Sequence, residues 1–212
     1  PIEVSVFYYR YPNEKKGVGS GVLNKELVQG TGDGISSLRE CIENNERLRY
    51  KMDDMMAKHS ANMDRVLPKG EIYMLSYALH LSRGGRFMSL AYEIDEQLLE
   101  VFDRLSNYAK HFYYGRYDIK CASVQSLKEG KDFTILEYNG CGAEPHHAYG
   151  NGKTLFQAYG IFLHHWKTLY KISKYNHEHG FPHWGFRRVW KYLKEGKAHY
   201  RLIKKLDAET EI

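Results

Sequence analysis

Apolar and polar side chains alternate from the first residues of the chain. Apolar side chains occupy every second position at Ile2, Val4, Val6 and Tyr8, and the pattern ends at Pro12. This is the pattern of a β-strand. The same criteria predict further strands at residues 18–28, 72–79, 114–122 and 133–138. The chain therefore carries the strands of an antiparallel sheet.

Apolar residues at helical spacing predict helices over residues 46–66, 94–112 and 154–176. Ser37 and Glu40 have the spacing of a capping box, which predicts a short helix running through Ile42. In the helix that follows Thr154 we expect His164 opposite the apolar face and His165 beside it. That apolar face is expected to consist of Leu155, Tyr159, Phe162, Trp166 and Leu169.

These elements together predict an α+β fold in which helices flank an antiparallel sheet. We expect residues 1–176 to form this unit and residues 177–212 to form a basic helical tail packed on it. A chain of 212 residues with 42% hydrophobic residues can bury a sizeable core. No apolar run reaches the roughly 18 residues of a membrane span, so we expect no membrane partner.

Composition adds little to this picture. The formal net charge of +5 favours anionic ligands without choosing among nucleotides, phosphates and nucleic acid. Three cysteines form no CxxC pair, and no secretory leader opens the chain, so we expect a cytoplasmic protein. Because the sequence begins at Pro1 in mid-strand, we expect it to be a piece of a longer polypeptide.

Two of the predicted strands carry the candidate chemistry. Arg116 and Asp118 share one face of the first, and Glu137 and Asn139 share one face of the second. If Asp118 pairs with Glu137 in a hairpin, Arg116 falls opposite Asn139, and facing Cβ atoms lie ~4.5–5.5 Å apart. Two carboxylates and an amide oxygen suit Mg²⁺, which proteins hold together with substrate phosphates. The alternative is a set of ordinary cross-strand salt bridges on a solvated face.

The sequence of these two segments resembles the C-terminal half of an ATP-grasp domain, in which an Arg-x-Asp strand precedes a Glu-x-Asn strand. Gly32-Asp33-Gly34 before the predicted helix start is similar to a turn of several ATP-grasp ligases. The loop after Asn139 and the helix bearing His164 resemble the C-terminal end of bacterial ATP-grasp proteins described as D-alanine–D-alanine-ligase-like. The resemblance covers most of residues 1–176, and the paired metal motif is its most specific part.

The resemblance implies roles for five residues. Asp118, Glu137 and Asn139 would hold two Mg²⁺ ions on ATP, with Glu137 bridging both. Arg116 would hold the transferred phosphoryl group and act in catalysis. Glu3 resembles the acidic residue that meets the ATP ribose.

The implied reaction is an ATP-dependent ligation of a small carboxylate to an amine through an acyl-phosphate. The family's adenine-contacting hinge and its glycine-rich, lysine-bearing phosphate cover should lie upstream of Pro1. The resemblance therefore implies that this chain holds the metal half of the site and is inactive alone.

Other chemistry-bearing residues admit plainer explanations. The histidines lack the spacing of a zinc site, and His164 and His165 are expected to diverge on their helix. His146 and His147 follow the metal strand, where a substrate contact is one option and a solvated loop position the favoured one. Cys141 lies in the same loop with no activating base in the sequence, so we expect a small loop residue.

The tail interleaves basic and aromatic residues and could bind single-stranded nucleic acid or another polyanion without catalysis. The favoured alternative is an amphipathic helix that packs Phe186, Trp190 and Leu193 and exposes its charges. No nucleic-acid-binding motif accompanies the charges, so nucleic acid is the less favoured partner. The tail is also a candidate contact of a homodimer.

Overall fold

The computed structural model describes residues 1–45, 48–49, 52–76, 86–149 and 152–209. The chain divides into two units, Pro1–Lys171 and Ile172–Ile212, and each is considered by itself. The strands are β1 Ile2–Tyr9, β2 Val18–Glu26, β3 Val28–Thr31, β4 Ile72–Ser76, β5 Arg86–Ser89, β6 Tyr114–Cys121 and β7 Phe133–Asn139. The helices are α1 Leu38–Glu43, α2 Met52–His59, α3 Glu96–Tyr108, α4 Val124–Lys128, α5 Leu155–Glu178 and α6 Phe186–Glu209, with short 3₁₀ turns η2 Ser60–Asn62, η4 Ala91–Glu93 and η5 His146–Ala148.

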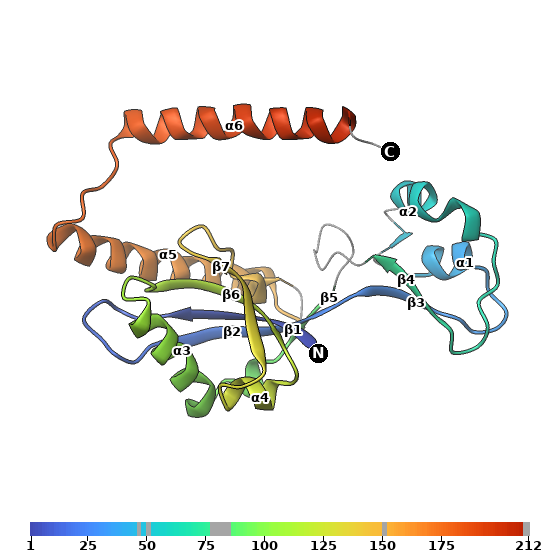
Figure 1. Ribbon diagram of the computed structural model, residues 1–212, viewed down its shortest axis with the longest axis horizontal. Coiled ribbons are helices and arrows are strands. Elements are labelled where there is room, and N and C mark those ends of the chain that lie inside the picture. Colours follow the sequence, from blue (N-terminus) through green and yellow to red (C-terminus); the bar gives the residue numbers. More distant parts are fainter. Residues whose placement is uncertain (46–47, 50–51, 77–85, 150–151, 210–212) are drawn as a thin grey trace. The chain divides into compact units, whose positions relative to one another are not determined.

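A five-stranded sheet in the order β5-β2-β1-β6-β7 forms the centre of the first unit. All four pairings between neighbouring strands are antiparallel. Figure 1 shows α3 and α4 on one side of this sheet and α5 on the other. The predicted α+β class, with an antiparallel sheet flanked by helices, is confirmed.

The alternation at the start of the chain buries one face of β1 in the main core. Val4, Val6 and Tyr8 are each at most 1% exposed and pack with Phe102 of α3. Asp95 caps α3 by accepting a hydrogen bond from the backbone N–H of Leu98. The opposite face of β1 carries the remaining side chains, and the candidate site lies there.

A second core lies in a small lobe of the same unit, formed by β3, β4, α1 and α2. The predicted capping box at Ser37 and Glu40 is present at the start of α1. The predicted strand 18–28 is interrupted at Leu27, because β3 pairs with β4 and not with the main sheet. Of the helix expected over 46–66, the structure shows α2 followed by η2, which ends at Asn62, while residues 46–47 and 50–51 lie outside the described residues. Residues 77–79 of the predicted strand 72–79 lie outside the described residues.

The link between β6 and β7 contains a helix that the apolar pattern missed. Ser123 caps α4: its hydroxyl accepts a hydrogen bond from the backbone N–H of Ser126, and the Ser126 hydroxyl accepts one from the backbone N–H of Ser123. Five residues are too few for a visible helical period, so the capping serines were the only signal. Gly130 then turns the chain with a φ of 70°.

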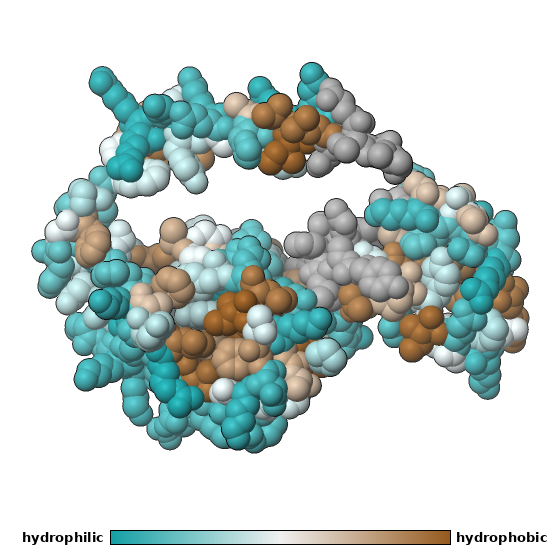
Figure 2. Space-filling model, viewed as in Figure 1, coloured by the Kyte–Doolittle hydropathy of each residue, from teal (hydrophilic) through white to brown (hydrophobic). Residues whose placement is uncertain are grey.

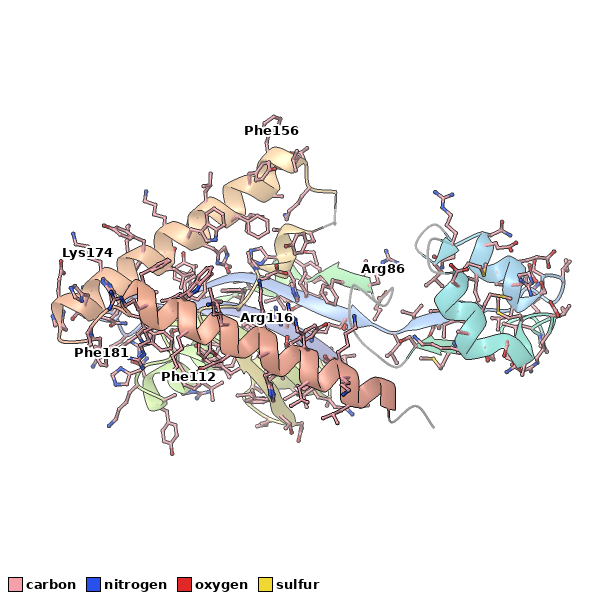
Figure 3. All side chains as sticks on the ribbon, turned by 90° about the horizontal axis from the view of Figure 1, so that it is seen from above. Arg86, Phe112, Arg116, Phe156, Lys174 and Phe181 are labelled. Carbon is pink, nitrogen blue, oxygen red and sulfur yellow. The ribbon has the colours of Figure 1, made fainter. Side chains whose placement is uncertain are left out.

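The buried face of α5 differs from the prediction. Leu155, Tyr159 and Trp166 are more than half exposed, whereas His165 and Thr168 are each 1% exposed. Phe162 and Leu169 are half-buried, as the predicted face requires. Figure 3 shows Phe156, near the start of α5, pointing away from the sheet. The prediction was wrong because it counted histidine as polar, although the His165 ring packs on Phe7 and Tyr114.

The second unit contains the end of α5 and the long helix α6. His177 and His183 stack within it, with ring centroids 4.1 Å apart. Apolar and hydrophilic residues both lie on the surface of α6 (Figure 2). Among the helices of the described residues, none is long and apolar enough to cross a bilayer.

Candidate functional site

The β6–β7 ladder brings the predicted residues together on one face. Asp118 pairs with Glu137 and Arg116 with Asn139, so the predicted register is confirmed. A register shift follows directly after Asp118, so the pairing resumes at Ile119 and Ile135. Arg116 lies on the five-stranded sheet in Figure 3. Four side chains with the predicted chemistry therefore share one patch.

Asp118 is the most constrained residue of this patch, at 4% exposed. Arg116 donates to both of its oxygens at 3.1 Å, and the Ser5 hydroxyl donates to Oδ1 at 2.5 Å. Burial by itself would raise the pKa of Asp118. The hydrogen bonds from Arg116 and Ser5 and the charge of Lys25 together outweigh burial and hold that pKa below its usual value. Asp118 is thus an ionised carboxylate with several donors.

Lys25 joins Glu3 to this group. Its Nζ lies 2.8 Å from Glu3 Oε1 and 3.2 Å from Asp118 Oδ1, and its side chain is 9% exposed. Sequence reasoning missed both Lys25 and Ser5. Ser5 had a signal, because alternation along β1 puts it on the same face as Glu3. Lys25 follows from the β1–β2 pairing opposite Glu3, which no residue pattern specifies.

Glu137 and Asn139 offer oxygen atoms that bond to none of the residues that the structure describes. Asn139 donates through Nδ2 to Asp118 Oδ2 at 3.2 Å, which turns its amide oxygen away from that bond. The Glu137 side chain is exposed and forms no ion pair with a residue that the structure describes. The facing carboxylates, with the amide oxygen beside them, match the donor chemistry of a Mg²⁺ site. Whether they ligate a metal stays a prediction.

Arg116 also reaches the loop after β7. Its Nη1 lies 3.2 Å from the carbonyl oxygen of Glu144 and 3.1 Å from His146 Nε2. The His146 ring stacks on Phe87, and both His146 and His147 are half-buried rather than solvated. Cys141, in the same loop, is exposed. The loop therefore fixes the guanidinium from a second side.

Histidines cluster on the same face of the sheet, farther along β1. His165 is buried against Phe7, and its Nδ1 lies 2.9 Å from the hydroxyl of Tyr114. The ring centroids of His147 and His165 are 5.3 Å apart. Across the part of the chain that the structure describes, no three His, Cys, Asp or Glu residues are placed to hold a metal ion.

These two imidazoles predict a pH dependence of stability. Burial lowers the pKa of His147 and of His165 to about 4, whereas the pKa of an unfolded histidine is about 6.5. At pH values between about 4 and 6.5 the unfolded chain therefore binds more protons than the folded protein does. The free energy of unfolding should therefore fall as the pH drops from about 6.5 to about 4, by up to about 1.4 kcal/mol per pH unit for each histidine.

Urea unfolding at a series of pH values measures this slope. The double variant His147→Gln/His165→Gln should show a shallower slope over the same interval. If its slope equals that of the wild type, other groups cause the pH dependence.

A cavity of about 1040 Å³ opens beside Glu3 and Lys25. Arg86 and Lys120 also line it, so cationic side chains from three strands of the main sheet face the same space. Its volume is at the upper end of the range of ligand sites for small molecules. Because Lys25 also contacts Asp118, the cavity adjoins the carboxylate patch.

Comparisons with known proteins place few limits on this chain. No protein-family model and no curated protein matches it. Twelve chains of solved structures match. One is a bifunctional glutathione synthetase from Pasteurella multocida, at 13% identity and a TM-score of 0.47, covering 70% of this chain and 21% of that one. The chain therefore spans about a fifth of the length of that protein.

Proposed function

We propose that this chain supplies the metal-binding half of an ATP- and Mg²⁺-dependent ligase that joins a carboxylate to an amine. One observation carries the proposal: β6 and β7 set Asp118 opposite Glu137 and Arg116 opposite Asn139 on one face. These are the residues for which the sequence resembles the Arg-x-Asp and Glu-x-Asn strands of ATP-grasp ligases. Two strands joined only by chance salt bridges would not be expected to carry both motifs and also to pair with the motif residues opposite one another.

In this proposal Asp118, Glu137 and Asn139 hold Mg²⁺ on the ATP phosphates. Bound Mg²⁺ supplies neutralisation of the charge that develops during phosphoryl transfer. Arg116 holds the transferred phosphoryl group, because its guanidinium is fixed by Asp118 and by the loop after β7. Glu3 would accept hydrogen bonds from the ribose hydroxyls, and Lys25, which lies between Glu3 and Asp118, would supply positive charge to the phosphates.

The reaction takes place in two steps. An oxygen of the substrate carboxylate attacks the γ-phosphorus, and the bond to ADP breaks, which gives an acyl-phosphate. The amine then attacks the acyl carbon and releases inorganic phosphate, so that an amide remains and the amine loses a proton. The proposal assigns no identity to the acid or to the amine.

Calorimetric titration of a non-hydrolysable ATP analogue into the protein that contains this chain tests the proposal. Heat of binding is expected with Mg²⁺ present and is expected to vanish when EDTA removes the metal. The 212-residue chain, titrated in parallel, should bind more weakly. Equal binding with and without metal, or none in either case, would contradict the proposal.

A second candidate function belongs to α6, which would bind a polyanion such as nucleic acid without catalysis. The supporting observation is that its basic side chains are all exposed: Arg187, Arg188, Lys191, Lys194, Lys197, Arg201, Lys204 and Lys205. The Arg188 guanidinium lies 4.2 Å from the ring centroid of Trp184. Such binding should weaken steeply with salt and persist in Asp118→Asn, unlike nucleotide binding.

A further inference from the structure

A separate cavity of about 540 Å³ lies between β2, η5 and the first half of α5. It does not share lining residues with the larger cavity beside Glu3. The polar side chains that line it are Ser20, His147, Lys153, Gln157, His164 and His165. The proposed ligase mechanism uses none of them.

His165 forms the buried wall of this cavity and is 1% exposed. Its Nδ1 is the one partner that the described residues offer to the hydroxyl of Tyr114, at 2.9 Å. A buried hydroxyl proton needs an acceptor, so we assign Tyr114 as donor and Nδ1 as acceptor. Nε2 then carries the ring proton. It is buried and has no hydrogen-bond partner among the described residues, so His165, which lines the cavity, carries a buried donor that no described residue satisfies.

Gly21 fixes the imidazole of His147 on the neighbouring wall. A Cβ added at Gly21 would lie 2.4 Å from Cγ of the His147 ring, so only glycine lets the ring pack on β2. The ring of Phe7 contacts His147 edge-on, with centroids 6.0 Å apart. The cavity wall is therefore built by packing rather than by a chance grouping of surface side chains.

The charge of the lining selects the ligand. Lys153 is exposed and forms no ion pair with a described residue, and no Asp or Glu lines the cavity in the described chain. Gln157 accepts a hydrogen bond from the backbone N–H of Thr154 through its amide oxygen, which leaves its NH₂ group as a donor. A cation and several donors without a carboxylate favour an anion.

We propose that this cavity binds a small organic anion through a carboxylate or phosphate group. Lys153 supplies the opposite charge, and the Nε2–H of His165 donates to the anion at the buried end. The proposal stands independently of the nucleotide site, because it rests on other residues and needs no metal. Its nearest connection to that site is His146, the chain neighbour of His147, which contacts Arg116 at 3.1 Å.

NMR of the histidine rings tests the proposal in the whole protein. Inorganic phosphate and succinate are titrated separately at neutral pH and constant ionic strength, and the signals are assigned with His147→Gln and His165→Gln. We expect saturable shifts of the His165 and His147 signals, and the anion that saturates at lower concentration identifies the preferred group.

Lys153→Gln and Lys167→Gln form a matched pair for this experiment. Both lysines are exposed, but Lys167 is on α5 and does not line the cavity. Lys153→Gln should weaken binding about tenfold, which corresponds to 1.4 kcal/mol, while Lys167→Gln should bind like the wild type. No saturable shift with either anion up to about 10 mM, or equal affinity in the two variants, would overturn the proposal.

Discussion

Asp118→Asn is expected to abolish Mg²⁺-dependent binding of an ATP analogue and to lower the free energy of unfolding by about 3 kcal/mol. The carboxylate is buried between Arg116 and Lys25, so its loss leaves the Arg116 guanidinium facing a neutral amide, whereas Lys25 keeps its ion pair with Glu3. Removing one partner of a buried ion pair is costly because the remaining charge has lost its compensation. Calorimetry measures the binding, and urea unfolding measures the stability.

Glu137→Gln separates the metal role from the structural one. Glu137 faces Asp118 across the ladder but is exposed and outside the ion-pair network. Its substitution should therefore abolish metal-dependent binding while changing the free energy of unfolding by no more than about 0.5 kcal/mol. If Mg²⁺-dependent binding of the ATP analogue persists in either variant, these carboxylates do not hold the metal.

Gly115→Ala is expected to disrupt the same site through the backbone. A Cβ at Gly115 would lie 2.5 Å from the backbone oxygen of Asn139 and 2.8 Å from the ring of Tyr138. A backbone atom cannot move aside as a side chain can, so β7 must shift away from β6. We expect a loss of about 1–3 kcal/mol in the free energy of unfolding and a large loss of Mg²⁺-dependent nucleotide affinity.

Gly142→Ala is the matched control, because a Cβ there meets no atom within 4 Å. It should leave both stability and nucleotide binding unchanged. Wild-type binding by Gly115→Ala would show that the spacing of β6 and β7 does not determine the site.

The sequence predicted the strand pair well because alternation and pairing are local rules. Asp118 and Glu137 needed only two strands and one register, and the polar residues on one face specified both. Lys25 could not be found in this way, since its place beside Asp118 depends on β2 pairing with β1, far from β6 in sequence.

The prediction of the buried face of α5 was wrong for a different reason. Helical spacing describes which residues share a face but not which face is covered, and aromatic residues lie on both sides of this helix. The neighbours Phe7 and Tyr114 determine which face is buried, because the imidazole of His165 packs against their rings. The Nδ1 atom of His165 has a hydrogen-bond partner in the Tyr114 hydroxyl. The sequence of α5 alone could not predict this contact, because Tyr114 lies on another element.

The double contact of Lys25 with Glu3 and Asp118 has a consequence for the order in which ligands enter. With Arg116 and Lys25 in place, the carboxylate is already neutralised, so a lone cation finds little attraction there. In the proposed site a polyphosphate would give both cationic side chains another anion to bind, and this would free Asp118. We therefore expect nucleotide and metal to bind with positive heterotropic cooperativity, each raising the affinity for the other by the same factor.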